Sequence, residues 1–170
     1  EFIANPEAVT GIFLRNAGSG DLTIASSTSF PAIIEGAEVG GGSGDIEITN
    51  EVGDLIVAGS ISAKLADPDD GDGGDVTLAV QDPDSRIVLD TTTQIRSAGL
   101  QTYNGDVVLA RATSVAADGG VDINGGLDTQ DSAAIPMPFT AALVDGTTFA
   151  VRDGVGTQRA LSSVTLSSVV

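Results

Sequence analysis

The stretch Gly74-Asp75-Val76-Thr77-Leu78 decides the fold, because its pattern of Gly-Asp followed by two apolar residues around a central one recurs along the chain. The same pattern begins at Gly20, Gly44, Gly53 and Gly105. Apolar residues at alternate positions are typical of a strand with one buried face. Gly and Asp are typical of the turn before such a strand. The sequence therefore predicts a series of short strands, each entered through a Gly-Asp turn.

The spacing of these strands predicts how they stack. Gly44 and Gly74 are 30 residues apart, and Gly74 and Gly105 are 31 apart. Short strands that recur at about this period indicate a parallel β-helix, in which each coil pairs with the next about 4.8 Å away. We expect about five coils, all in one solenoid domain over residues 1–170. An antiparallel β-sandwich, which also consists of short strands and turns, is the alternative.

The composition agrees with a narrow, aliphatic interior. The 170 residues are 41% hydrophobic but only 4% aromatic, and 22 of them are Gly. Strands place alternate side chains on one face, so the apolar positions of the Gly-Asp strands should share one core. We expect this core to include Leu22, Ile24, Ile46, Ile48, Val76, Leu78, Val107 and Leu109.

The charge and the absent residue types exclude several functions. A net charge of −17 disfavours nucleic acid and anionic membrane surfaces as partners. With no Cys and no His, disulfides, thiol catalysis and a Ser/His/Asp triad are excluded. No signal peptide or membrane span is visible, so we expect no membrane insertion. The chain begins at Glu1-Phe2 without Met, which we interpret as a segment cut from a longer protein.

An acidic cluster precedes the strand at Val76. Calcium binds six to eight oxygen ligands, so this cluster is a candidate calcium site. The spacing does not fit an EF-hand, because the twelfth position from its first aspartate is Leu78 instead of Glu. A solvated acidic turn is the alternative, and we predict no other cofactor. The candidate ligands are Asp67, Asp69, Asp70, Asp72 and Asp75.

Two stretches are predicted to contact a partner. Residues 129–144 lack Gly and contain two prolines, which cannot donate hydrogen bonds to a sheet, so we expect an insertion loop there. The last residues alternate apolar and polar side chains and form an edge without a cap. The predicted contact residues are Pro136, Met137, Pro138 and Phe139 in the loop, and Val164 and Leu166 in the last strand.

Two phrases in the second half resemble a known family. Gln101–Leu109, "QTYNGDVVL", resembles the Q-T-Y-x-G-x-V-x-L phrase of filamentous-haemagglutinin-like exoproteins, and Gly120–Asp128, "GVDINGGLD", is similar to the G-x-V-x-F-x-G-x-V-D phrase that follows it. The chain departs from the family at Ile123, where Phe is common, and in its Pro-bearing insertion. The resemblance implies a right-handed β-helix in a large secreted or surface-attached bacterial adhesin. In this family the two motifs have a structural role and contain no catalytic residue.

Three functions follow from these observations. The first is a non-catalytic repeat segment of a secreted or cell-surface adhesin, a stalk or rod that binds a glycan or protein on a host or neighbouring cell. The second is an extracellular structural protein that forms filaments through its solenoid ends. The third is a carbohydrate-active β-helix enzyme that uses Asp84, Arg86, Asp90, Arg96 and Arg111. We expect no enzymatic activity, because the usual general bases and cofactor motifs are missing.

Overall fold

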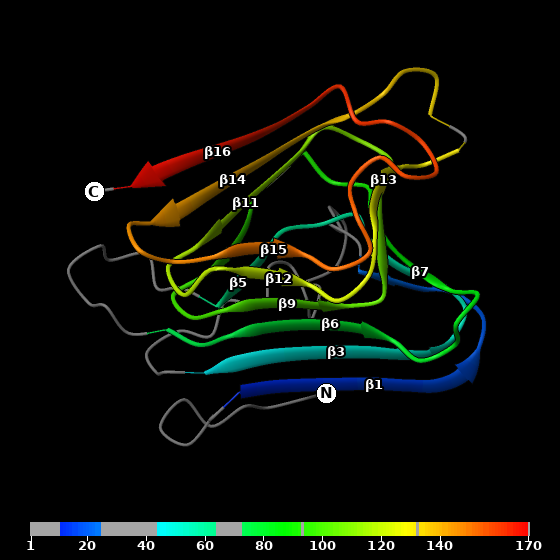
Figure 1. The fold of residues 1–170 in the computed structure, drawn as a ribbon. Coiled ribbons are helices and arrows are strands. Elements are labelled where there is room, and N and C mark those ends of the chain that lie inside the picture. Colours follow the sequence, from blue (N-terminus) through cyan, green and yellow to red (C-terminus); the bar gives the residue numbers. More distant parts are fainter. Residues whose placement is uncertain (1–10, 25–43, 64–72, 93, 132, 170) are drawn as a thin grey trace.

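The described structure consists of parallel strands joined by turns and loops. The computed structural model describes residues 11–24, 44–63, 73–92, 94–131 and 133–169, and these contain strands and no helix (Figure 1). Sheet A consists of β1 (Gly11–Ser19), β3 (Asp45–Val52), β6 (Val76–Val80), β9 (Gln101–Asn104), β12 (Val121–Ile123) and β15 (Phe149–Val151), in that order. Sheet B consists of β2 (Leu22–Ile24), β4 (Leu55–Val57), β7 (Arg86–Leu89), β10 (Asp106–Leu109) and β13 (Leu127–Thr129). Sheet C consists of β5 (Ile61–Ala63), β8 (Ile95–Ser97), β11 (Thr113–Ala117), β14 (Pro138–Val144) and β16 (Ser163–Val169).

The order of the strands is that of a solenoid. From β3 to β14 the chain runs through sheets A, B and C in turn, and each new strand pairs in parallel with the preceding strand of its sheet. The last coil has β15 in sheet A and β16 in sheet C, with only an isolated bridge from Val155 to Leu127 in place of a strand of sheet B. Figure 1 shows this as a stack in which β1, β3, β6, β9, β12 and β15 follow one another from blue to orange. All the strand pairs of the three sheets are parallel, so the antiparallel β-sandwich is wrong.

The core lies between the three sheets, as the alternating pattern predicts. Of the eight predicted core residues, seven are buried and Leu22 is partly buried against them. The largest buried side chains are Tyr103 and Phe139, and the others are mostly Ile, Leu and Val. The phenol of Tyr103 donates to Gln101 Oε1 at 2.9 Å, so the one hydroxyl-bearing aromatic side chain in this core has its partner.

The Gly-Asp turns hold neighbouring coils together. Each of the five aspartates accepts, through Oδ1, a backbone N–H from the start of the next strand in its sheet, at 2.8–2.9 Å. Gly53 and Gly74 allow the coils to approach, because a Cβ on Gly74 would lie 2.2 Å from the carbonyl oxygen of Gly44 and one on Gly53 would lie 2.5 Å from the carbonyl carbon of Gly20. The Gly-Asp motif therefore allows one coil to pack closely on the next and to hydrogen-bond to it.

The predicted alignment of coils is wrong at one place. The similar intervals between Gly44, Gly74 and Gly105 predict that Val107 stacks on Val76, but Val107 pairs with Ile87 and Leu127 in sheet B, whereas Val76 belongs to sheet A. The cause is unequal coil length. The hydrogen bonds between turns of neighbouring coils show this. Asp45 and Asp75 are 30 residues apart, Asp75 and Leu100 are 25 apart, and Asp106 and Gly126 are 20 apart.

The predicted insertion loop at 129–144 is also only partly a loop. Its second half is β14, which pairs with β11 on one side and β16 on the other. Pro138 is the first residue of β14 and pairs only with β16, so the absence of its N–H breaks no bond to β11. The irregular part lies between β13 and β14.

Candidate functional site

The acidic cluster is described at one residue only. Asp67, Asp69, Asp70 and Asp72 lie outside the described residues. Asp75 uses Oδ1 to accept the backbone N–H of Leu100 at 2.8 Å, which ties this carboxylate to the next coil. Within the described ranges, no group of three or more acidic side chains is placed to hold a metal ion. Calcium binding at this cluster stays a prediction.

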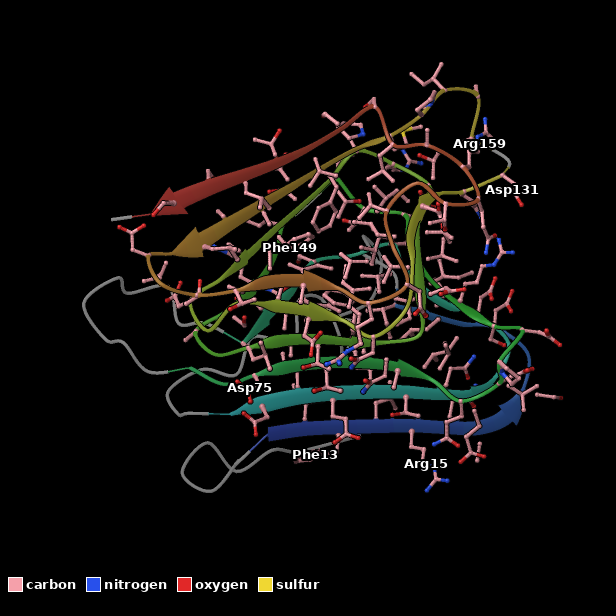
Figure 2. All side chains as sticks on the ribbon, viewed as in Figure 1. Phe13, Arg15, Asp75, Asp131, Phe149 and Arg159 are labelled. Carbon is pink, nitrogen blue, oxygen red and sulfur yellow. The ribbon has the colours of Figure 1, made fainter. Side chains whose placement is uncertain are left out.

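One arginine holds the irregular segment between β13 and β14. The Arg159 guanidinium donates to the backbone carbonyl of Gln130 at 3.2 Å and also to those of Asp131 and Ala133. Figure 2 shows Arg159 and Asp131 together beside this segment, at one end of the stack. Thr129 Oγ1 accepts the backbone N–H of Met137 at 3.1 Å and closes the segment from its other end.

The predicted contact residues of this segment differ in exposure. Pro136 is exposed, and its neighbour Ile135 is 65% exposed. Met137 and Pro138 are partly buried. Phe139 is fully buried and packs on Phe149 with ring centroids 5.7 Å apart, so its prediction as a contact residue is wrong. The β-strand alternation explains this, since Phe139 occupies an inward position of β14.

In the last strand, β16, apolar side chains occupy positions that face inward in the neighbouring strand β14, yet they are exposed. Val164 pairs with the buried Phe139, and Leu166 pairs with the buried Ala141. Val164 is nevertheless 39% exposed and Leu166 is 55% exposed, because β16 is the edge strand of sheet C in the described structure. These two predicted contact residues are therefore accessible at one end of the stack.

The charged residues of the enzyme alternative do not gather in one place. Arg111 Nε lies 2.5 Å from Asp90 Oδ1, so these two form an ion pair. Arg86, in sheet B, lies 3.8 Å from Asp131. Arg96 lies on β8 of sheet C and points outward there. Asp84 belongs to the turn before β7, where its backbone N–H donates to Asp82 Oδ1 at 3.1 Å.

A hollow on the outer face of sheet A was missed by the sequence analysis. It has a volume of about 270 Å³ and lies near β1, the edge strand of the sheet. Its lining includes Phe13, which is 66% exposed. The available signal was Phe13 itself, because it alternates with Ile12 and Leu14 and must therefore face away from the core.

Comparison with known proteins gives no relatives. No family model, no curated protein and no solved structure matches this chain. Over the residues that the structure describes, no helix is long and apolar enough to cross a membrane. The residues themselves, and the sheets that place them, are therefore the basis for a functional interpretation.

Proposed function

We propose that the chain is a non-catalytic, rod-like segment of a secreted or cell-surface adhesin. The observation that carries this proposal is that successive coils pair in parallel, strand on strand, within each of the three sheets. In this proposal the sheets form a right-handed β-helix of about five coils. Such a stack is stiff along its axis because each coil is hydrogen-bonded to the next. A stiff rod suits reach and display better than catalysis.

The segment held by Arg159 supports a role in binding. The Arg159 guanidinium binds backbone carbonyls of this segment, including that of Ala133, two residues before the exposed Ile135. A preorganised contact loses less conformational entropy when a partner binds. We take a glycan or protein on another cell as that partner.

An attachment assay tests the proposal. Beads coated with the purified chain should bind to cultured cells, and Ile135→Ser should weaken this binding without changing the melting temperature. Val52→Ser, which also removes an exposed apolar side chain, is the matched control and should bind as the original chain does. The proposal is overturned if the chain releases reducing ends from a polysaccharide and Asp90→Asn abolishes that activity.

A second function, self-assembly, is supported by the exposed apolar residues at the end of the stack. Val155, Val164 and Leu166 are 44%, 39% and 55% exposed. An unpaired strand edge with apolar side chains can add another strand in parallel or antiparallel. In this alternative, one molecule stacks on the next and a filament grows along the rod axis.

A further inference from the structure

The hollow on sheet A is built from two neighbouring strands and one turn. Phe13 and Arg15 on β1 pair in register with Glu47 and Thr49 on β3. All four line the hollow, together with Leu14 and with Gln81, which follows β6. Figure 2 shows Phe13 and Arg15 at the β1 edge of the stack. Register partners on adjacent strands lie about 5 Å apart, so the Phe13 ring and the Glu47 carboxylate start from neighbouring positions on one face.

Some of the polar side chains that line the hollow have a hydrogen-bond partner, and others have none. The positive group is already paired, because Arg15 Nε donates to Glu51 Oε1. Within the described residues, by contrast, the side chains of Glu47, Thr49 and Gln81 make no hydrogen bond or ion pair. Thr49 is only 8% exposed, so water or a ligand reaches its hydroxyl from the hollow that it lines. The Thr49 hydroxyl is not fully enclosed, and it is free to accept a hydrogen bond from a molecule in the hollow.

These free groups match the needs of an ammonium ion. A primary ammonium has three N–H donors and no acceptor. The hollow offers three acceptor side chains, namely the Glu47 carboxylate, the Thr49 hydroxyl and the Gln81 amide oxygen. It also offers the exposed Phe13 ring, and the face of an aromatic ring attracts a cation. We propose that this hollow binds the side-chain ammonium of a lysine in a basic polypeptide.

The charge of the chain favours a polypeptide over a small amine. A net charge of −17 attracts a multiply charged cation from a distance and raises its association rate. A basic segment carries several such charges, whereas a single amine carries one. The hollow belongs to sheet A alone, so it exists whether or not the chain is a segment of an adhesin.

Titration with model peptides tests this site. A short oligolysine peptide added to the isotope-labelled chain should shift the backbone amide NMR signals of Phe13, Thr49 and Gln81. The same peptide with acetylated lysines should leave them in place, because acetylation removes the ammonium. Added salt should weaken the binding, since the attraction is partly between charges. Methylamine at the same amine concentration should bind more weakly than oligolysine.

Variants separate this site from general attraction to an acidic protein. Glu47→Gln should reduce the oligolysine affinity about tenfold, and Phe13→Leu about threefold, as expected for a charged hydrogen bond and a cation–π contact. Both side chains are exposed, so neither change should affect folding. Asp153→Asn removes the same charge from an exposed residue after β15 and should leave the affinity unchanged.

Three outcomes would overturn the proposal. If Asp153→Asn weakens binding as much as Glu47→Gln, the attraction comes from the net charge alone. If oligolysine shifts none of the three amide signals, the hollow binds no lysine. If a neutral oligosaccharide shifts them and oligolysine does not, the ligand is a sugar.

Discussion

The backbone N–H of Asp75 donates to Oδ1 of Asp45 at 2.9 Å, and this bond joins two residues that are 30 positions apart in the sequence. Asp75 in turn accepts the backbone N–H of Leu100 through its own Oδ1. One side chain therefore serves both as the turn residue that begins a strand and as the contact between coils. A single row of such carboxylates links three consecutive strands of sheet A.

Asp54 occupies the same position in sheet B and gives the first prediction. Its Oδ1 accepts the backbone N–H of Arg86 at 2.8 Å, and its own N–H donates to Asp21 Oδ1. Asp54→Ala removes the acceptor and should lower the free energy of unfolding by about 1–2 kcal/mol. Asp54→Asn keeps an acceptor oxygen and should lose less. Urea denaturation measures both, with Asp153→Ala as the control; equal stability of all three variants would contradict the role of the carboxylate.

Two adjacent glycines give a matched pair for the second prediction. A Cβ on Gly125 would lie 2.6 Å from the carbonyl of Gly105 in the coil below, whereas a Cβ on Gly126 would meet its nearest atom at 3.4 Å. Gly125→Ala should therefore force the coils apart and destabilise the fold by about 2 kcal/mol or more. Gly126→Ala should change the stability by less than about 1 kcal/mol. Thermal and urea unfolding of the two variants compare them directly, and the reverse ranking would contradict the close stacking at this corner.

Tyr103 gives a prediction for high pH. Burial raises the pKa of its phenol, because a charged tyrosinate would be desolvated in the core. A group whose pKa is higher in the folded state stabilises the fold fully below its unfolded pKa, about 10, and this stability is lost as the pH rises further. The free energy of unfolding should therefore fall above about pH 10, and tyrosinate absorbance should appear only with unfolding. Tyr103→Phe should be less stable at neutral pH but should lose less stability at high pH. Tyrosinate absorbance in a still-folded chain would show that the phenol is accessible.

The exposed end of the stack gives the fourth prediction. If molecules associate through β16, light scattering should rise with protein concentration. The double variant Val164→Lys, Leu166→Lys should abolish that rise while the melting temperature stays within a few degrees, because both side chains are exposed. Association that persists in the double variant would place the contact elsewhere.

Local features of the fold could be predicted from the sequence. The alternation in Val76–Leu78 and Val107–Leu109 correctly predicts strands whose apolar residues face one core. The Gly-Asp turns correctly predict where strands begin. These features depend on interactions between residues that are close in the sequence, where the period of two and the turn preferences apply.

The pairing of strands could not be predicted in the same way. Gly74-Asp75 opens a strand of sheet A, and Gly105-Asp106 opens a strand of sheet B, although the two motifs have the same sequence pattern. At both positions the turn must allow neighbouring coils to approach closely and must provide an acceptor for a backbone N–H of the next coil. The motif therefore predicts a turn before a strand, but it does not predict the sheet to which that strand belongs. Paired positions in neighbouring coils are 20 to 34 residues apart, so the similar intervals from Gly44 to Gly74 and from Gly74 to Gly105 are a coincidence.

The candidate sites were predicted less well, because their contacts join distant residues. Arg159 holds Ala133 and Gln130 across 26 and 29 positions, and no local pattern marks that contact. The hollow combines β1, β3 and the residue after β6, which meet only when the coils stack. Exposure of Pro136 followed from the proline-bearing loop, and exposure of Val164 and Leu166 followed from the uncapped last strand. Burial of Phe139 required knowledge of the register of β14.

The central claim, parallel stacking in the observed register, is tested most directly by engineered disulfides in a chain that has no native cysteine. Thr77 and Thr102 are register partners on the outer face of β6 and β9, and neighbouring strands bring Cα atoms to about 5 Å, within the range of a disulfide. Thr77→Cys with Thr102→Cys should form an intramolecular disulfide on mild oxidation and raise the melting temperature. Thr77→Cys with Val108→Cys, the pair expected from equal coils, should stay reduced, because Val108 pairs with Val88 and Asp128 in sheet B. A disulfide in the second pair and none in the first would contradict the account.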